Sequence, residues 1–543
     1  MASRHVALVA AIALLNASLS FHNIWPTPAI SWTGQLSIEV AIALLLLVAA
    51  HGAARLKPSR AGSSSPPAAP RTPSSAWIRA LAVVWVVLTI GHYADVTTPA
   101  LYGRDINLYW DVRYMPDVAA MVARAAPVWL IVVVIGAVAS ALVLLYLLFR
   151  WALGRVADAM ADPRSRAAVA VYAAAVLLLF AAHQTIGVLP ETAFSTPVAA
   201  TYARQARLVA GAMRASATLA PSPPMDASLS RVRGADVFLI FIESYGAIAF
   251  ERPEIAPRLD APRAALDAAI RATGRSVVST LVDSPTFGGS SWLAHVSLMS
   301  GVEVRDPETN ARLLTEHRDT MVSNFKARGF RTIALMPGLR QRWPEGSFYA
   351  FDDMYGARRL DYRGPEFGWF AIPDQFSLAR FDAIEVDRAA RPNLFVFYPT
   401  ISTHFPFIPT PPYQPDWSRM FDRRPYDGPS IVRAYAQQPD WTHFGPGYVD
   451  AVSYTYATLA GYLRKQASRD CVLIVLGDHQ PAAAVSGEGA SWSVPVHVVA
   501  SRPAILDALV ARGFRRGLVP ARPALTRMHT LLPILLESFS GDR

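Results

Sequence analysis

Long apolar runs crowd the first 190 residues of the chain. Their length is typical of helices that cross a lipid bilayer, which need about 20 apolar residues each. The clearest run, Pro127 to Phe149, contains no charged side chain. The first run is short and follows Arg4 and His5, so it could also be a cleaved signal peptide. The pattern predicts five membrane spans, near residues 5–22, 36–54, 76–94, 127–149 and 167–188.

The rest of the chain alternates between short, continuous apolar runs and helical stretches. Continuous runs of this kind are typical of strands that are buried on both faces of a parallel sheet. Helices are expected between them, near 258–272, 292–299, 318–328 and 447–466. The alternation predicts an α/β domain with a central, mostly parallel sheet. The expected strands are Ala235–Glu243, Arg331–Met336, Leu394–Tyr398, Cys471–Leu476 and, less cleanly, Val496–Ala500.

These patterns divide the chain into a transmembrane domain over residues 1–190, a proline-containing linker over 191–230 and an α/β domain over 231–543. Short loops rich in arginine and lysine stay in the cytoplasm. Loops 55–71 and 150–166 each carry four such residues. Five spans with these loops inside place the α/β domain on the extracytoplasmic side, whether or not the first span is cleaved.

Composition narrows the classes of function. The chain is 52% apolar, which excludes wholesale disorder. The single cysteine, Cys471, excludes an intramolecular disulfide framework and a cysteine-rich zinc module. The net charge of +10 comes almost entirely from arginine, which suits phosphate and carboxylate but also reflects a GC-rich genome.

The same composition argues against two alternatives. The basic residues form no run interleaved with aromatics, so no nucleic-acid partner is expected. The spans carry few charges and show no obvious internal repeat, which disfavours a transporter or channel.

Polar side chains end two of the expected strands, at the position where open α/β sheets bind ligands. Glu243 directly continues an apolar run, and a buried carboxylate there needs a partner. Asp478 and His479 end another run. Two carboxylates and an imidazole suit a divalent ion, so these three residues are candidate metal ligands. Taken one by one, each also fits an ordinary turn or cap.

A glycine-rich segment, Pro285 to His295, leads into an expected helix. Ser290 or Ser291 then stands at the helix N-terminus, where free N–H groups stabilise negative charge. One of the two serines could cap the helix while the other reacts as a metal-activated nucleophile.

Two further strand ends carry candidate substrate-binding residues. His404 lies in a loop of aromatics and prolines, where it could bind a phosphoryl oxygen, act as a general acid or simply pack. Arg340, Arg342 and Trp343 follow another strand and could clamp an anion and stack on a substrate, or be ordinary surface residues.

These motifs, in this order, resemble the membrane-anchored branch of the alkaline phosphatase–sulfatase superfamily: lipoteichoic acid synthases, phosphoglycerol transferases and phosphoethanolamine transferases. The resemblance covers nearly the whole chain and implies an N-terminal five-helix bundle with an exported sulfatase-like domain. It is carried by Phe-Ile-Glu243-Ser-Tyr, Gly-Gly-Ser-Ser-Trp through Gly301, Ser-Thr-His404-Phe-Pro and Gly-Asp478-His479.

The resemblance also implies an activity: metal-dependent transfer of a phospholipid head group to an envelope glycan or lipid through a covalent phospho-serine, at a bacterial inner (cytoplasmic) membrane. Ser291 is the expected nucleophile and a further metal ligand, because Ser300-Gly301 follows it at the spacing of related helices. Ser290 is the alternative and Thr286 a distant third. The ligand set suits one Zn²⁺ or Mn²⁺, with Mg²⁺ possible.

The chain departs from that family in two ways, and it also lacks the motif of formylglycine sulfatases. The usual nucleophile is threonine, and the usual Asp-His-Gly is here Asp-His-Gln480. No proline or arginine follows Ser291 in the pattern of formylglycine sulfatases. Two alternatives therefore stay open: a phosphoester or sulfoester hydrolase of the same fold, and a non-catalytic envelope protein that retains it.

Overall fold

The computed structural model describes residues 2–541 except 57–74, 110, 114, 117–118, 120–127, 187–188, 215–218, 341–342, 439 and 441–442. Arg342 and most of the basic loop at 55–71 lie outside the described residues. The chain forms two compact units. One comprises residues 1–100 and 105–215, and the other comprises residues 101–104 and 216–543.

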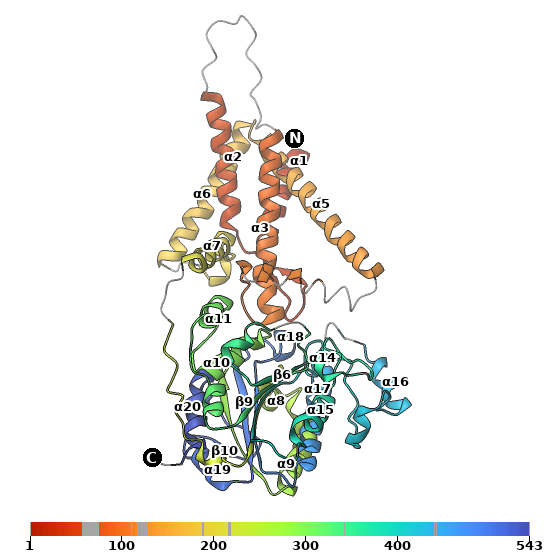
Figure 1. Ribbon diagram of the computed structural model, residues 1–543. Coiled ribbons are helices and arrows are strands. Elements are labelled where there is room, and N and C mark those ends of the chain that lie inside the picture. Colours follow the sequence, from red (N-terminus) through yellow and green to blue (C-terminus); the bar gives the residue numbers. More distant parts are fainter. Residues whose placement is uncertain are drawn as a thin grey trace, which may run out of the picture. The chain divides into compact units, whose positions relative to one another are not determined.

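Apolar helices build the first unit (Figure 1). A helix stands at the place of each of the five expected spans. The first ends at Ala17, and a short antiparallel pair, β1 (Phe21–Asn23) with β2 (Ile30–Trp32), follows it. The helices are α1 (Ala2–Ala17), α2 (Ile38–Leu56), α3 (Ser75–Tyr102), α5 (Val128–Ala159) and α6 (Pro163–Ile186).

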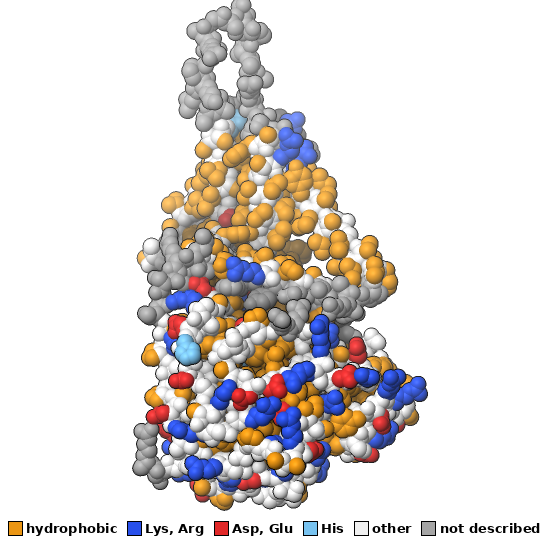
Figure 2. All heavy atoms as spheres, in the orientation of Figure 1, with side chains coloured by type: hydrophobic (Ala, Val, Ile, Leu, Met, Phe, Trp, Pro, Cys, Tyr) orange, Lys and Arg blue, Asp and Glu red, His pale blue; other side chains and the backbone are white. Residues whose placement is uncertain are grey.

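Three helices in the described part of the chain are long and apolar enough to cross a membrane: Ala76–Tyr102, Val128–Ala159 and Pro163–Ile186. The apolar stretches of α1 and α2, Arg4–Ala17 and Ile38–Gly52, are shorter. Hydrophobic side chains cover the visible surface of this unit (Figure 2). On α5, for example, Val132, Ile135 and Leu144 are 58–64% exposed. Soluble proteins rarely expose so large an apolar surface, whereas lipid would cover it.

A helix occupies part of the expected linker. α7 (Val198–Arg214) belongs to the helical unit. Its Thr201 hydroxyl donates to Asp95 at 2.7 Å, and the Ala199 N–H donates to Glu39 at 3.1 Å. The helical unit therefore extends to about residue 215, and the prolines from Pro221 onward belong to the second unit.

The second unit is built on one mixed sheet. Its nine described strands follow the order β10-β4-β9-β8-β3-β7-β5-β6, with β11 beside β4. The central strands β8, β3, β7 and β5 pair in parallel. All five expected strands are confirmed. The bounds are β3 (Asp236–Ile242), β4 (Ser276–Asp283), β5 (Arg331–Met336), β6 (Asp353–Gly356), β7 (Leu394–Pro399), β8 (Cys471–Gly477), β9 (Ser493–Ala500), β10 (Arg515–Arg516) and β11 (Thr526–Arg527).

One side of the sheet departs from the parallel pattern. β9 runs antiparallel to both β8 and β4. The sequence did not predict β4, because Ser279 and Thr280 interrupt its apolar run. Both of these side chains are buried in the structure.

Helices cover both faces of the sheet (Figure 1). Phe238, Ile240 and Ile242 of β3 pack into one core with α9 (Asp260–Ala272), α15 (Asp374–Phe381) and α17 (Gly445–Lys465). Val237, Leu239 and Phe241 pack into another. That second core includes α10 (Ser291–Ser300), α12 (Met321–Ala327), α19 (Pro503–Val510) and α20 (Met528–Phe539). Burial on both faces explains why β3 reads as a continuous apolar run.

Short helices fill the connections, and the only cysteine lies at the start of β8. Cys471 is buried, and burial raises the pKa of its thiol to about 11. The short helices are α8 (Ile248–Glu251), α11 (Pro307–Leu313), α13 (Gly346–Tyr349), α14 (Ala357–Leu360), α16 (Gly428–Ala436) and α18 (Ala483–Ser486). The remaining turns are η1 (Glu191–Ala193), η2 (Ser230–Val232), η3 (Ala256–Leu259), η4 (Asp382–Val386) and η5 (Trp417–Phe421).

Candidate active site

The register of the central strands brings the candidate ligands together. β3 and β8 pair in parallel up to Ile242 with Gly477, so the next residues, Glu243 and Asp478, emerge side by side. β7 flanks β3 on the other side, and the Thr400 hydroxyl that follows it accepts the Glu243 N–H at 3.2 Å. Three adjacent strand ends therefore form the floor of the site.

Glu243, Asp478 and His479 form a compact cluster. Each offers one ligand atom, and these atoms lie within 4.8 Å of one another. Nε2 of His479 is 3.4 Å from Oε1 of Glu243 and 3.5 Å from Oδ2 of Asp478. Oδ2 of Asp478 is buried and has no hydrogen-bond partner among the described residues. A divalent cation would satisfy that buried oxygen, so the residues present fit a metal ion.

Hydrogen bonds from the backbone fix the orientation of these ligands. Oδ1 of Asp478 accepts the N–H groups of Ser244 at 2.8 Å and His479 at 2.6 Å. Nδ1 of His479 lies 2.7 Å from the carbonyl oxygen of Gln480, and donation there leaves Nε2 free as a ligand. The same carbonyl accepts the Gly288 N–H at 3.1 Å. Gln480 thereby ties the Asp-His pair to the segment that carries the serines.

Burial and the charges of neighbouring groups together set the pKa values of the cluster. Burial and the neighbouring charge of Glu243 raise the pKa of Asp478 to about 8. Burial alone would lower the pKa of His479, but the charges of Asp478 and Glu243 raise it to about 9. Burial alone would raise the pKa of Glu243, but His479 and, more weakly, His404 hold that pKa below its usual range. A bound cation would displace the protons that this cluster otherwise holds.

Of the three candidate nucleophiles, Ser291 contacts the cluster. It is the first residue of α10, and its hydroxyl donates to Oε2 of Glu243 at 2.9 Å and lies 3.2 Å from Nε2 of His479. Ser290 precedes the helix in the left-handed conformation, with φ of 61°. Thr286 donates to the Gly289 carbonyl at 2.6 Å. The geometry therefore favours Ser291 as the reacting hydroxyl.

Sequence reasoning missed two supporting residues. Ser244 adopts a φ of 57°, and its hydroxyl donates to Oε1 of Glu243 at 3.1 Å. Thr400 orients the backbone of Glu243 from the neighbouring strand. Their positions, directly after β3 and β7, are the signal that could have found them. Strained backbone such as that of Ser244 and Ser290 is often found at functional sites.

The candidate substrate-binding residues differ in their placement. His404 follows β7, and its Nδ1 lies 2.7 Å from the Phe405 carbonyl oxygen. The exposed Arg340 donates to the Trp369 carbonyl at 3.3 Å. Trp343 stacks on Tyr349, with 5.6 Å between the ring centroids, and packs against the second core.

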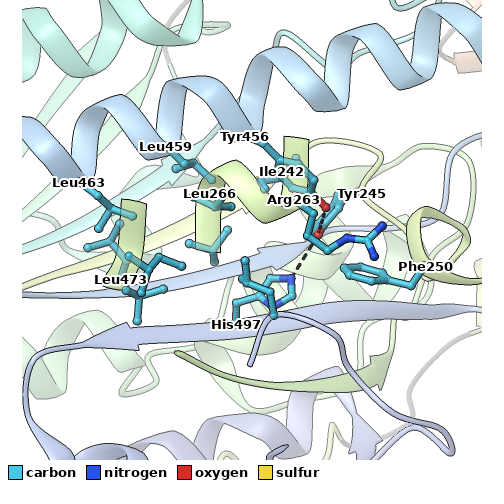
Figure 3. Close-up of a pocket in the computed structure, with 14 residues that line it drawn as sticks. Ile242, Tyr245, Phe250, Arg263, Leu266, Tyr456, Leu459, Leu463, Leu473 and His497 are labelled. Carbon is cyan, nitrogen blue, oxygen red and sulfur yellow. Dashed lines mark hydrogen bonds between the residues drawn. The ribbon is translucent and has the colours of Figure 1, made fainter. Parts of the chain in front are cut away.

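The core beneath the site contains a chain of hydrogen bonds. Tyr245 points from the end of β3 into this core, and its hydroxyl lies 2.6 Å from that of Tyr456 and 3.2 Å from Nε2 of His497 (Figure 3). Nδ1 of His497 lies 2.7 Å from the Ser279 hydroxyl, which donates to the Gly517 carbonyl at 2.6 Å. The Gly517 carbonyl only accepts, so Ser279 donates to it and accepts from Nδ1 of His497. Because the His497 imidazole is neutral, its Nε2 then accepts from Tyr245, which in turn accepts from Tyr456.

A small cavity lies beside this chain of hydrogen bonds. The cavity beside these residues holds about 20 Å³, room for about one water molecule, so it is part of the core rather than a substrate site. Burial, together with the charge of Arg263, lowers the pKa of His497 to about 3, so its imidazole is neutral.

Solved structures similar to this chain include the integral membrane lipooligosaccharide phosphoethanolamine transferase A of Neisseria meningitidis. It is 12% identical, the match covers 98% of this chain and 96% of that one, and the TM-score is 0.46.

Two similar structures match about half of this chain. The lipoteichoic acid synthase LtaP of Listeria monocytogenes is 14% identical, with 52% of this chain and 69% of that one covered and a TM-score of 0.35. The zinc complex of the C-terminal periplasmic domain of EptC from Escherichia coli is 12% identical, with 52% and 77% covered and a TM-score of 0.33. No protein-family model and no curated protein matches the chain.

Proposed function

We propose that this protein is a metal-dependent phosphotransferase of a bacterial cytoplasmic membrane. It moves a phospholipid head group, of the phosphoglycerol or phosphoethanolamine type, to a hydroxyl of an envelope glycan or lipid. The observation that carries this proposal is the contact of the Ser291 hydroxyl with Glu243 and His479, two of the three candidate metal ligands. The name of the similar Neisseria meningitidis protein, a phosphoethanolamine transferase, supports a head group of the phosphoethanolamine type.

Glu243, Asp478 and His479 would hold one cation, with Ser291 as a further ligand. When bound, the cation would favour the alkoxide form of Ser291 and offset phosphoryl charge. One nitrogen among oxygen ligands suits Zn²⁺ or Mn²⁺, with Mg²⁺ possible. The zinc complex of the similar EptC domain supports zinc.

The chain's own residues carry the transfer in two steps. Oγ of Ser291 bonds to the lipid phosphorus, and the bond from phosphorus to the diacylglycerol oxygen breaks. The hydrogen bond to Oε2 of Glu243 orients the Ser291 hydroxyl, whose proton is released to water as the new bond forms. The His404 imidazolium donates from Nε2 to a phosphoryl oxygen while water protonates the departing diacylglycerol, or it gives that Nε2 proton to the diacylglycerol oxygen and regains one from the acceptor hydroxyl in the second step. An acceptor hydroxyl then bonds to phosphorus, and Ser291 leaves with a proton.

Arg340 and Arg342 follow the adjacent strand β5 and are the further residues proposed to steady phosphoryl oxygens. The sequence suggests that Trp343 stacks on the substrate. In the structure its ring packs on Tyr349, which favours a role in supporting the segment that carries Arg340.

The membrane arrangement is part of the proposal. Five spans would anchor the chain, with the basic loops at 55–71 and 150–166 in the cytoplasm and the α/β unit outside. Reporter fusions test this: a fusion ending near residue 160 should be active only as a cytoplasmic reporter, and one ending near residue 230 only as an exported reporter. The opposite pattern would contradict the orientation.

The direct test is mass spectrometry of the peptide that carries Ser290 and Ser291. Full-length protein is incubated with mixed bacterial phospholipids and a divalent metal, without acceptor. A phosphoglycerol or phosphoethanolamine adduct on Ser291, with release of diacylglycerol, is expected. Sustained lipid cleavage with water and no adduct would indicate a hydrolase. Untouched lipid with every metal tried would contradict the proposed function.

A further inference from the structure

Half-buried apolar side chains surround His404 at the strand-end edge of the sheet. They come from two loops, residues 367–372 and residues 401–411, and we call this surface the apolar wall. Its main members are Trp369, Phe370, Ile401, Ile408 and Pro409. Among the residues that line this hollow, His404 is the only titratable one.

The ends of the central strands hold this wall in place. The Phe370 ring stands nearly perpendicular to the His404 ring, with 5.0 Å between their centroids. Gly338, just after β5, approaches Phe370 so closely that a β-carbon there would lie 3.0 Å from its ring. Arg340, two residues later, donates to the Trp369 carbonyl. The wall therefore belongs to the same edge of the sheet as the metal-ligand cluster.

Both loops contain strained backbone. Ala371 has a φ of 70° and Phe407 a φ of 72°, in the left-handed region that residues with a β-carbon rarely adopt. A bulky residue there is a clear outlier. Strain of this kind persists where the surroundings impose it, and it is often found at ligand-binding sites.

We propose that the apolar wall contacts the glyceride end of the phospholipid donor, the part that leaves as diacylglycerol. This inference rests on the proposed function. The lining contains no Asp, Glu, Lys or Arg, which complements an uncharged acylglycerol, and its one histidine could face the adjoining phosphoryl group. A sugar ring would need hydrogen-bonding partners for several hydroxyls, and among the lining residues only Trp369, Ser402 and His404 offer side-chain partners. The enclosed space is only about 10 Å³, so the lipid lies along the wall and does not enter a tunnel.

The experiment compares a lipid with its own deacylated form. Full-length protein in nanodiscs is given phosphatidylglycerol or glycerophosphoglycerol, which share the reacting phosphodiester and differ only in the acyl chains. Wild type should prefer the acylated donor. Phe370→Ala should lower that preference, measured as the ratio of the two kcat/KM values, by about tenfold, mainly through the KM for lipid.

Two variants control for indirect effects. Phe421→Ala removes an aromatic side chain that is 48% exposed on η5 and is not among the residues that line the hollow, so it should keep the wild-type preference. Phe370→Leu keeps an apolar side chain and should retain most of the preference. Bound metal, measured in every variant, shows whether the cluster is intact.

The outcomes separate this inference from the function on which it rests. An equal loss of activity on both substrates in Phe370→Ala would overturn the wall's role, because it would show a general supporting effect. An unchanged preference in that variant would overturn it too. Wild type that cleaves neither of these substrates, nor phosphatidylethanolamine or its deacylated form, would overturn the proposed function itself.

Discussion

The hydroxyl of Ser291 donates a hydrogen bond of 2.9 Å to Oε2 of Glu243, from the start of α10 to the end of β3. Two further hydrogen bonds fix the backbone near these partners. The Thr400 hydroxyl accepts the N–H of Glu243, and the Gln480 carbonyl accepts the N–H of Gly288, three residues before Ser291. The proposed nucleophile therefore stands at a helix N-terminus, where free N–H groups would favour developing negative charge.

Replacing Ser291 with alanine should abolish lipid cleavage, by at least about 10³-fold, because loss of a nucleophile removes the covalent route. Ser290→Ala should retain activity within about tenfold, since its hydroxyl is not the one that contacts the cluster. Diacylglycerol release measures both effects. An adduct that forms on Ser290 in the Ser291→Ala protein would assign the reaction to the other serine.

Asp478→Asn should lower metal affinity by at least about 100-fold, because a direct ligand is worth more than the 10–100-fold of an outer-shell partner. The asparagine oxygen can still accept the N–H groups of Ser244 and His479, so the fold should survive. Bound metal, counted by elemental analysis, tests this, with Glu488→Gln at an exposed acid of the following loop as the control.

Removing metal with a chelator gives a second test of the same site, measured as the melting temperature. A ligand that binds only the folded state adds stability. Removing metal should therefore lower the melting temperature of wild type and leave that of Asp478→Asn unchanged. An equal drop in both proteins would indicate that the stabilising metal binds elsewhere.

Gly477→Ala should destabilise the α/β unit by more than about 3 kcal/mol. A β-carbon at Gly477 would lie 1.8 Å from the backbone carbonyl oxygen of Tyr245, which cannot rotate away as a side chain can. Gly428→Ala is the matched control, because a β-carbon there meets nothing within 4 Å. Thermal unfolding of the full-length variants compares the two, and similar melting temperatures would contradict the steric argument.

The low pKa of His497 should make the free energy of unfolding of the protein fall in acid. Its pKa is about 3 in the folded protein and about 6.5 when unfolded, so below pH 6.5 the unfolded state takes up a proton that the folded state refuses. This group should remove up to about 1.4 kcal/mol of stability per pH unit as the pH falls from 6.5 toward 3.

His497→Gln isolates that effect. The glutamine amide can donate to Ser279 and its oxygen can accept from Tyr245, as the neutral imidazole does. The variant should be less sensitive to acid than wild type in denaturant titrations at several pH values. Parallel pH profiles for the two proteins would show that His497 is not the group responsible.

The sequence predicted those parts of the molecule whose signals are local. β3 and β8 are continuous apolar runs that end in a carboxylate, and such runs mark strands and their ligand-bearing ends without knowledge of their neighbours. The sequence preferred Ser291 to Ser290 only through its spacing to Ser300-Gly301, and the structure adds the physical reason: the first turn of α10 directs the Ser291 hydroxyl toward Glu243.

The missed features depend on contacts between distant segments. β4 contains Ser279 and Thr280, which look unfavourable in a buried strand until Ser279 is seen between His497 and Gly517. The apolar wall combines two loops whose aromatic residues, considered separately, look like ordinary packing. Burial of polar groups and contact between distant loops depend on the folded chain, so no local sequence pattern predicts them.

The buried Cys471 makes this protein convenient for spectroscopy. Its thiol lies at the start of β8, is 2% exposed and has a pKa raised to about 11, so little thiolate is available to react at neutral pH. Cysteines introduced on the surface would therefore be the reactive ones, with no native thiol to remove first. A pair of spin labels or fluorophores, one in the helical unit and one in the α/β unit, could measure the distance between the two units with and without added lipid.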